Sequence, residues 1–422
     1  MIKKILLKGP LLTRSGYGEQ ARFALRSLRS RPELFDVYIQ PLAWGQTSWL
    51  GEESEERKWI DGAIEKTISY IQQGGQFDMS LQVTIPNEWE KIAPVNVGYT
   101  AGIETTIIAP EWVQKADLMD RIIVISNHSK NVFNNTTFEA ESKETGEQFT
   151  LTNNTPVTVV NYPTKQYDSL PDVELDLEYN FNFITVAQFG PRKNIENTIR
   201  WFMEEFQNDE VGLVLKTNMA KNCYMDREHV YNKIRGIIGG YPIADRKCKL
   251  YLLHGDMTDE EMHALYKHPK IKAMPAFTHG EGFGLPLFEA AYSGIPVIAA
   301  GWSGQCDFLF DENAYVQFYN VAFDLENIPE DAVWKGVLQA ESQWAYPREH
   351  DAKNKMRACY NDLTNKDTWE ETQTKYEKYA EALHERFAKE KMYEQFVDAT
   401  YGEKIDVSAW FEELSEEVEE YE

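Results

Sequence analysis

Residues 279–304 read HGEGFGLPLFEAAYSGIPVIAAGWSG, and this stretch decides the fold class of the chain. Its first part is rich in glycine and leads into the helix-compatible segment Leu287 to Tyr292. Pro286 falls in the first helical turn, where its missing N–H costs little. The last part, Ile295 to Ala300, is a short apolar run that is typical of a buried strand. The stretch therefore predicts a glycine loop, a helix and a strand in that order.

The start of this predicted helix is suited to binding an anion. Gly282 and Gly284 allow close approach of a ligand to the backbone. The unpaired N–H groups and the positive end of the helix dipole favour a phosphate or diphosphate. Glu289 lies one to two turns further along, too far to cap the helix, so it can accept hydrogen bonds from neutral hydroxyls such as those of a ribose.

Glu281 and Glu289 are separated by seven residues within the frame EGFGLPLFEAAYSGIPVIA. This frame resembles the signature of the retaining nucleotide-sugar glycosyltransferases of family 4. The resemblance covers roughly residues 1 to 365 and implies the GT-B fold, in which two Rossmann-like, doubly wound α/β domains face a cleft. An ordinary strand–loop–helix connection of an α/β domain remains the alternative.

The composition is that of a globular protein without a membrane span. The chain has 422 residues, of which 42% are apolar and 13% aromatic, and this length favours two or three domains. A net charge of −25 disfavours a general affinity for nucleic acid or anionic membrane. Four widely spaced cysteines predict free thiols, and no apolar segment approaches the roughly 20 residues of a membrane span. With no signal peptide recognisable at the start, a cytoplasmic location is the default expectation.

The first half of the chain alternates strand-like and helix-like segments, which predicts a doubly wound domain. A glycine loop, Ser15 to Gly18, is expected between the first strand and a helix over 19–30. Gly16 and Gly18 occupy the place of the family's first-domain glycine loop, so the resemblance implies that they approach the donor phosphates. The other predicted strands lie at 35–41, 77–85, 95–99 and 121–126, with a helix over 54–73.

Ligands in such sheets bind at the carboxyl ends of strands, so the loop after Tyr99 is a candidate acceptor loop. Many family members carry a histidine in the corresponding loop, near the transferred sugar, but the candidate in this sequence is Glu104. Glu104 would bind acceptor hydroxyls or help to move a proton; an ordinary surface carboxylate is the alternative. In the next loop, Ser126 and Asn127 are expected to cap a helix that begins near Ser129.

Three arginines recur along one side of the predicted first helix, at positions 22, 26 and 29. A solvated helix face is one interpretation. The other is docking onto an anionic acceptor, and it motivates a second hypothesis for the reaction: transfer of a sugar to a hydroxylated base in DNA, as in phage-type DNA modification.

The second domain is expected to hold the donor. Its predicted strands lie at 181–188, 211–215, 249–253 and 271–275, and a capped helix is expected from about 258 to Tyr266. The family's phosphate-binding lysine corresponds to Lys193, but Gln188 stands where the arginine usually lies. Arg192 or Lys216 is left to supply the second cation.

The resemblance thus implies two sets of site residues. The catalytic set is Glu281, Glu104 and Lys193, with Glu281 against the transferred sugar. The donor-binding set is Gly16, Gly18, Arg192, Lys193, Lys216, Gly282, Phe283, Gly284, Leu285 and Glu289, with Glu289 at the ribose.

The domain boundaries are expected at 1–165 for the acceptor domain, 180–345 for the donor domain and 346–422 for C-terminal helices with an acidic tail. The pattern over 330–383 predicts helices with a Trp-Ala-Tyr-Pro break at 344–347. Similar enzymes end with helices that cross back to the first domain, and residues 344–363 are the candidate for this crossing. The polar stretch 139–155 predicts a hairpin or a mobile insertion.

The expected activity is transfer of a glycosyl group from a nucleoside diphosphate sugar to an acceptor hydroxyl, with retention of configuration. No Asp-x-Asp motif occurs, so no metal or other cofactor is expected beyond the sugar nucleotide as co-substrate. A saccharide or glycoconjugate is the expected acceptor. Besides the DNA hypothesis, a GT-B sugar-nucleotide epimerase and a non-catalytic nucleotide-binding scaffold remain open.

Overall fold

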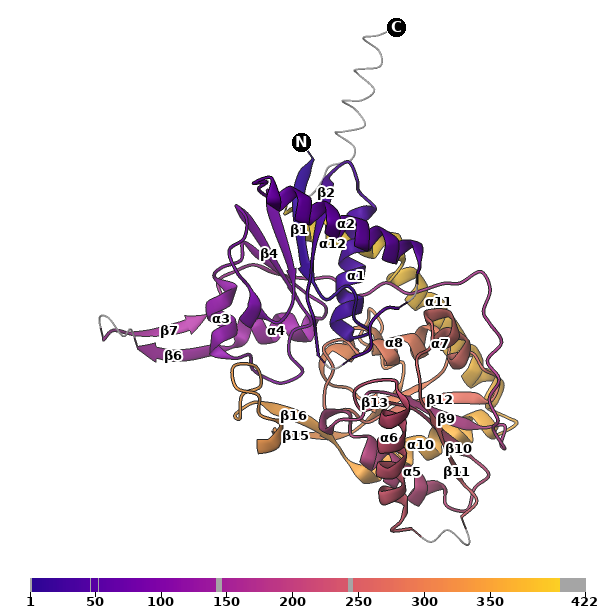
Figure 1. Cartoon of the computed structure of the whole chain (residues 1–422). Coiled ribbons are helices and arrows are strands. Elements are labelled where there is room, and N and C mark those ends of the chain that lie inside the picture. Colours follow the sequence, from indigo (N-terminus) through magenta and orange to yellow (C-terminus); the bar gives the residue numbers. More distant parts are fainter. Residues whose placement is uncertain (1, 46, 52, 142–145, 242–245, 403–422) are drawn as a thin grey trace.

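Two six-stranded parallel sheets form the centres of two α/β domains (Figure 1). The first sheet has the strand order β2-β1-β3-β4-β5-β8, and the second has the order β11-β10-β9-β12-β13-β14. The structure is a computed structural model that describes residues 2–45, 47–51, 53–141, 146–241 and 246–402. Within these residues the predicted two-domain, doubly wound α/β architecture is confirmed.

The first domain packs helices against both faces of its sheet, because each strand is followed by an amphipathic segment. Its sheet strands are β1 (Lys3–Gly9), β2 (Phe35–Pro41), β3 (Met79–Val83), β4 (Val95–Thr100), β5 (Arg121–Val124) and β8 (Val157–Val159). Its helices are α1 (Gly16–Arg29), α2 (Glu55–Gln72), η1 (Pro86–Glu88), α3 (Pro110–Ala116) and α4 (Asn127–Asn135).

The second domain repeats this arrangement. Its strands are β9 (Asn182–Val186), β10 (Gly212–Lys216), β11 (Lys249–Leu253), β12 (Ile271–Ala276), β13 (Val297–Ala300) and β14 (Tyr319–Val321). Its helices are η2 (Pro191–Lys193), α5 (Ile195–Phe206), α6 (Tyr224–Ile238), α7 (Asp259–Tyr266), α8 (Leu285–Tyr292), η3 (Ser303–Gln305) and α9 (Cys306–Leu309). The predicted helix with Pro286 in its first turn is confirmed as α8.

Strand order reverses once in each sheet, between β1 and β3 and between β9 and β12. Ligands of open α/β sheets bind outside the carboxyl ends of the strands at such reversals. The loops after β1, β9 and β12 all begin there. The topology thus brings the Gly16 turn, the Arg192–Lys193 turn and the Glu281 loop to the carboxyl ends of the two sheets.

Helix α1 begins earlier than the sequence predicts. Ser15 is its N-cap and accepts a hydrogen bond from the Gly18 N–H at 2.9 Å, so both loop glycines lie in the first helical turn. The prediction of a glycine loop before a helix over 19–30 was wrong at this boundary, because the Ser15 cap offsets the low helix propensity of glycine.

The C-terminal third differs most from the prediction. Residues 330–343 were predicted as helix, but an antiparallel ribbon of β15 (Phe323–Asn327) and β16 (Gln343–Pro347) precedes α10 (Glu349–Thr364), with η4 (Glu330–Ala332) in its loop. The predicted break at 344–347 coincides with β16. Helix α10 packs on α5 and β14 of the second domain, so the predicted crossing by residues 344–363 was wrong.

The chain returns to the first domain two helices later. Helix α11 (Trp369–Arg386) packs on α8, and α12 (Lys389–Tyr401) packs on α1 and β5. Figure 1 shows both helices in yellow at the back of the molecule. Phe396 and Val397 of α12 are fully buried against the first domain. The predicted acidic tail lies outside the described residues.

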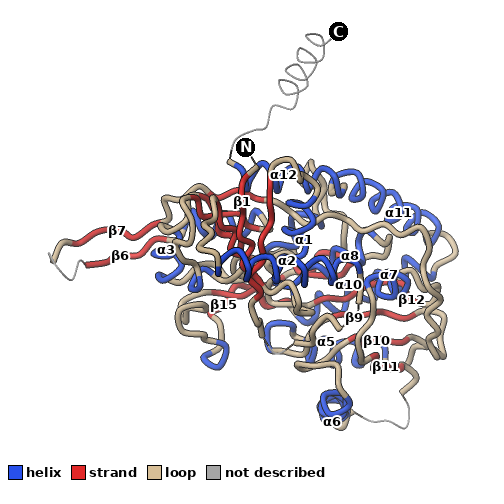
Figure 2. Tube along the Cα trace, turned by 45° about the horizontal axis from the view of Figure 1, so that its top comes forward, coloured by secondary structure: helices blue, strands red, loops and turns tan. Residues whose placement is uncertain are grey.

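A two-stranded hairpin of β6 (Thr137–Glu141) and β7 (Gln148–Thr152) projects from the first domain (Figures 1 and 2). The hairpin alternative for residues 139–155 is confirmed where the structure describes them; the turn at 142–145 lies outside those residues. All four cysteines are free thiols. In the described part of the chain, no helix has the length and apolarity needed to span a bilayer.

Candidate active site

Glu281 is the centre of a buried cluster of charged groups. The Nζ atom of Lys193 lies 2.6 and 2.8 Å from its two carboxylate oxygens, and Nη1 of Arg192 lies 3.1 Å from Oε2. The Glu281 backbone N–H donates to Oγ of Ser303 at 2.8 Å. The turn after β9 thus holds the carboxylate, while the loop after β13 holds the backbone of Glu281.

The cluster determines the ionisation of Glu281. Burial by itself would raise the pKa of this carboxyl group, but the adjacent Lys193 and Arg192 outweigh burial and lower the pKa to about 2. Burial also lowers the pKa of the Lys193 ammonium, and Glu281 opposes that effect. Glu281 is therefore a carboxylate at every pH at which the protein would work.

Glu104 joins the cluster from the first domain. Its Oε1 lies 3.1 Å from Nη2 of Arg192, so this arginine bridges Glu104 and Glu281 and links the two domains. Arg192 also donates to the Gly280 carbonyl. Of the two cations that the sequence left open for the second phosphate-binding position, Arg192 lies in the cluster. The Lys216 ammonium instead donates to the Gly255 carbonyl.

Glycines let the two domains approach closely at this point. A Cβ atom on Gly280 would lie 2.5 Å from the Glu104 carbonyl oxygen, and one on Gly282 would lie 2.8 Å from that of Ala101. Of these two glycines, only Gly282 was predicted to contact a phosphate. In the structure, the loop after β4 of the first domain packs against both.

The other predicted donor-binding residues after β12, Phe283, Gly284 and Leu285, differ in which of their atoms a ligand could contact. Gly284 is the N-cap of α8 and has φ +94°, a conformation that favours glycine. The Phe283 ring is buried against Tyr162, Phe288 and Phe308, so only its backbone can face a ligand. Leu285, the first residue of α8, packs at the edge of the same core.

Glu289 lies in a separate small cavity between the interdomain linker and helices α7 and α8 of the second domain. The cavity has a volume of about 30 Å³ and is lined by Lys165, Tyr167, Asp259, Met262, His263, Tyr266, Glu289 and Tyr292. The Tyr266 hydroxyl donates to Glu289 at 3.3 Å. This volume accommodates only one or two water molecules, whereas ligand pockets measure about 300–1,000 Å³. A ribose can reach Glu289 only if the lining residues move apart.

Glu289 gives a prediction for the pH dependence of stability. Burial raises its pKa to about 7, although Lys165 opposes the shift. The folded protein then binds one more proton than the unfolded chain between about pH 4.5 and 7. The free energy of unfolding should therefore fall as the pH rises through this window, by up to roughly 3 kcal/mol from this group.

The variant Glu289→Gln removes this titration, so it should gain stability relative to the wild type between pH 5 and pH 8. Urea denaturation at both pH values measures the gain. The exposed Glu260 on α7 supplies the control, because Glu260→Gln should give the same difference at both pH values. A pH-independent effect of Glu289→Gln would show that Glu289 is already charged in the folded protein.

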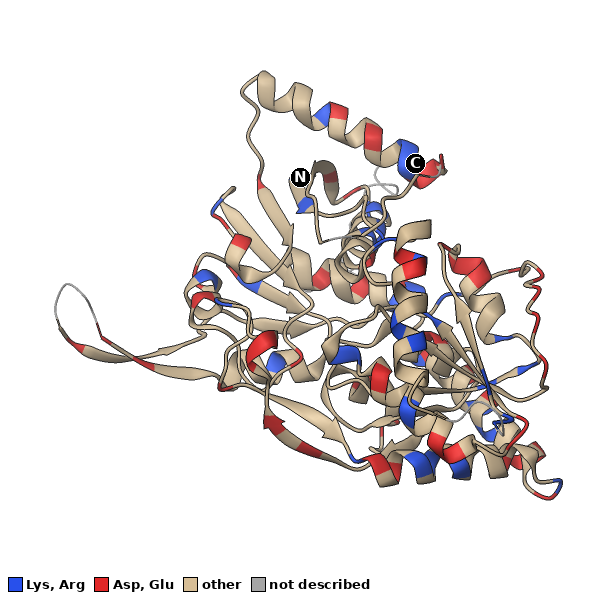
Figure 3. Ribbon diagram, turned by 60° about the horizontal axis from the view of Figure 1, so that its bottom comes forward, with Lys and Arg blue, Asp and Glu red and all other residues tan. Residues whose placement is uncertain are grey.

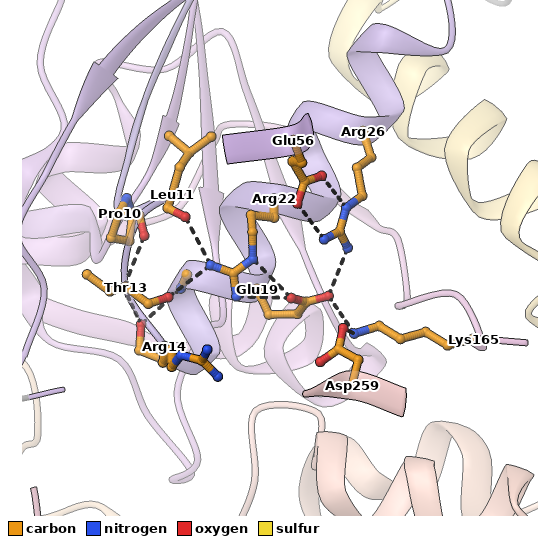
Figure 4. A network of polar contacts seen from close by, with 12 residues as sticks. Pro10, Leu11, Thr13, Arg14, Glu19, Arg22, Arg26, Glu56, Lys165 and Asp259 are labelled. Carbon is orange, nitrogen blue, oxygen red and sulfur yellow. Dashed lines mark hydrogen bonds and ion pairs between the residues drawn. The ribbon is translucent and has the colours of Figure 1, made fainter. Parts of the chain in front are cut away.

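Beside this cavity, a network of ion pairs connects the two domains (Figure 4). Lys165, in the interdomain linker, lies 3.0 Å from Glu19 of α1 and 2.7 Å from Asp259 of α7. Burial would raise the pKa of Glu19, but Lys165, Arg22 and Arg26 hold it well below its usual range. The sequence analysis missed Glu19, Lys165 and Asp259, because no local motif indicates that they meet.

The arginines of α1 are engaged within the protein. Arg22 donates to the carbonyls of Leu11 and Thr13 and pairs with Glu19, while Arg26 pairs with Glu19 and Glu56 (Figure 4). Arg29 lies over the Trp59 ring. Neither predicted interpretation, a solvated face or a docking face, describes Arg22 and Arg26. Acidic and basic residues are interspersed along the helices seen in Figure 3.

Gly16 and Gly18 differ in the space around them. A Cβ on Gly18 would lie 2.0 Å from the Thr13 carbonyl oxygen, whereas a Cβ on Gly16 would meet nothing within 4 Å. Gly18→Ala should therefore lower the free energy of unfolding by about 1–3 kcal/mol, despite the better helix propensity of alanine. Gly16→Ala is the matched control and should be neutral or slightly stabilising. Equal urea midpoints for the two variants would contradict this prediction.

Two further polar contacts join the domains near the site. Asp307 of α9 accepts hydrogen bonds from the Asn127 N–H at 3.0 Å and from the Asn161 side chain at 2.9 Å.

The predicted cap of α4 is confirmed, because Ser126 Oγ accepts from the Ser129 N–H. The capping box of α7, Thr258 with Glu261, is also as predicted. Among the described residues, no three His, Cys, Asp or Glu side chains are grouped as metal ligands.

Comparison with known proteins agrees with this architecture. The family model described as "Glycosyl transferases group 1" matches residues 246–321, which include the whole Glu281 to Glu289 stretch. No curated protein sequence matches the chain.

Solved structures with the same fold cover nearly the whole chain. Anabaena HepE in complex with UDP and glucose has a TM-score of 0.56 and 13% identity, over 95% of this chain and 100% of that one. Sucrose-phosphate synthase from Thermosynechococcus elongatus has a TM-score of 0.56 and 13% identity, over 94% and 98%. A glycosyltransferase from Rickettsia africae has 0.57 and 9%, over 94% and 97%. The chain also covers 55% of S. aureus TarM, with a TM-score of 0.47.

The chain therefore has the GT-B fold, and residues 246–321 match the glycosyl transferases group 1 family.

Proposed function

We propose that the protein is a glycosyltransferase that moves a glycosyl group from a nucleoside diphosphate sugar to an acceptor hydroxyl with retention of configuration. The observation that carries the proposal is the cluster of Lys193, Arg192 and Glu281 at the carboxyl ends of β9 and β12. Two adjacent cations in a buried site suit a leaving diphosphate, whose negative charge grows as the glycosyl bond breaks.

The proposal assigns roles to the residues of the Glu281 cluster, to the start of α8 and to Glu289. Lys193 and Arg192 stabilise the leaving diphosphate, together with the backbone N–H groups at the start of α8. Glu281 is ionised and accepts hydrogen bonds from the transferred sugar. Glu289 accepts the ribose hydroxyls once the cavity around it has opened. The cations of the chain itself supply the charge stabilisation, so we propose that the reaction proceeds without a metal ion or other cofactor.

The acceptor is proposed to be a saccharide or a glycoconjugate. It would enter beside Glu104, on the loop that the first domain presents to the Glu281 cluster. The alternative acceptor, a base in DNA, loses its motivation, because Arg22 and Arg26 pair with acidic residues of the protein itself.

A thermal-shift screen tests the donor site. UDP, GDP, ADP and their glucose conjugates are added to the wild type and to Glu289→Ala, with and without EDTA. A ligand at about 100 times its dissociation constant should stabilise the wild type by roughly 2.7 kcal/mol. The variant should lose this response, and the control Glu260→Ala should keep it. If no nucleotide stabilises the wild type, the donor-site proposal is wrong.

Product analysis separates the proposed reaction from its alternatives. A glycosyltransferase releases the nucleoside diphosphate faster when an acceptor is present. An epimerase would convert the donor sugar without any acceptor, and a scaffold would bind the nucleotide and release no diphosphate in any mixture.

A further inference from the structure

Arg192 is held between two carboxylates from different domains. Glu104 of the first domain and Glu281 of the second each lie 3.1 Å from its guanidinium group. Lys193 pairs only with Glu281 among the described residues. The cluster therefore contains two cations and two carboxylates, and its net charge is zero before any ligand arrives.

The reaction changes the charge beside this cluster. The diphosphate of a sugar nucleotide carries about two negative charges. The nucleoside diphosphate left after transfer carries about three, because the terminal phosphate ionises with a pKa near 6. Any fixed carboxylate next to the diphosphate consequently repels the product more strongly than the donor.

Glu104 is such a fixed carboxylate. Its backbone carbonyl lies so close to Gly280 that a Cβ there would approach it to 2.5 Å, so the acceptor loop is locked against the donor loop. The side chain of Glu104 is about one-quarter exposed, so the repulsion is only partly screened by solvent. Its carboxylate pairs with Arg192, one of the two cations that the proposed function assigns to the diphosphate.

We propose that Glu104 is a charge-balancing residue that promotes release of the diphosphate product. When no diphosphate is bound, the Glu104 carboxylate pairs with Arg192. This ion pair breaks when Arg192 contacts the diphosphate of the donor, and it forms again as the product leaves. Glu104 is thus a positioning residue that acts through Arg192. This inference rests on the proposed glycosyltransferase function and explains why a carboxylate stands in the acceptor loop.

The test compares Glu104→Gln with the wild type by isothermal titration. The probes are a nucleoside diphosphate and its glucose conjugate, with the base that stabilises the wild type in the screen above. In Glu104→Gln the diphosphate should bind about tenfold more tightly and the sugar conjugate about threefold more tightly. The preference for product over donor should therefore increase about threefold. In turnover assays the variant should show a lower kcat and stronger product inhibition.

Two control variants separate the effect of the Glu104 charge on ligand affinity from the effect of substitution in general. Glu65→Gln removes an exposed carboxylate from α2 and should leave both affinities unchanged. Glu104→Asp keeps the charge on a shorter side chain and should restore much of the wild-type ratio. If Glu104→Gln does not fold, Glu104→Ala removes the same charge and takes its place, and the inference again requires a roughly threefold rise in the preference for the diphosphate.

The outcomes distinguish failure of this inference from failure of the proposed function. If the wild type binds neither probe, the donor site itself is wrongly assigned. If the wild type binds both, and Glu104→Gln weakens both or changes both by the same factor, the site stands but Glu104 does not discriminate product from donor.

Discussion

Lys193→Ala should lower the kcat of glycosyl transfer by about 10²–10³-fold, because a preorganised charge facing the leaving group contributes that much in buried sites. The Lys193 ammonium lies within 2.8 Å of both Glu281 oxygens, at the centre of the cluster. Its removal leaves Arg192 alone to stabilise the leaving diphosphate. Release of nucleoside diphosphate at saturating donor and acceptor measures the effect.

Lys216→Ala is the matched control for this prediction. Lys216 also ends a parallel strand of the second domain, but its ammonium donates to the Gly255 carbonyl. Its loss should lower kcat less than tenfold. The result would contradict our assignment if Lys216→Ala were the more damaging of the two while both variants remained folded in a thermal melt.

Phe396→Ala should lower the free energy of unfolding by about 3–5 kcal/mol, the usual cost of deleting a buried aromatic side chain. Phe396 of α12 has 0% exposure, and its ring lies 5.2 Å from that of Phe23 and 4.9 Å from that of Tyr99. The variant therefore creates a cavity where the C-terminal helix covers the first domain.

Urea denaturation measures this loss. Phe149→Ala is the control, because Phe149 on β7 is 47% exposed and its removal should change the free energy by less than about 0.5 kcal/mol. A two-step transition in Phe396→Ala would indicate that the first domain unfolds before the second. Equal stability of both variants would contradict the observed packing of α12.

Much of the fold of the second domain could be predicted from the sequence, because short segments specify its helices and strands. The glycines, Pro286 and the apolar run after Gly294 specify a loop, a helix and a strand through short-range preferences, and the structure has α8 and β13 in those places. The alternation of strands and helices likewise predicted both doubly wound sheets, since each segment carries its own periodicity.

Boundaries and long-range connections were predicted less well. The start of α1 was missed because the Ser15 cap offsets two glycines that otherwise read as a loop. Residues 344–347 were predicted only as a break in a helical pattern, and pairing with β15 makes them the strand β16. Such pairing depends on residues about 20 positions away in the sequence.

The residues of the candidate site were likewise predictable only in part, and their contacts between the two domains were not. From the sequence alone, Glu281 and Glu289 were predicted to bind a donor because they share one motif of fixed spacing, and Lys193 was predicted from the family resemblance. Only the tertiary structure decided that Arg192 pairs with Glu104, that Lys165 connects Glu19 with Asp259, and that Glu289 lines a cavity too small for a ribose. These contacts join the two domains, and the physical reason is that charge pairing across a cleft depends on how the two sheets are oriented, which no local pattern of residues encodes.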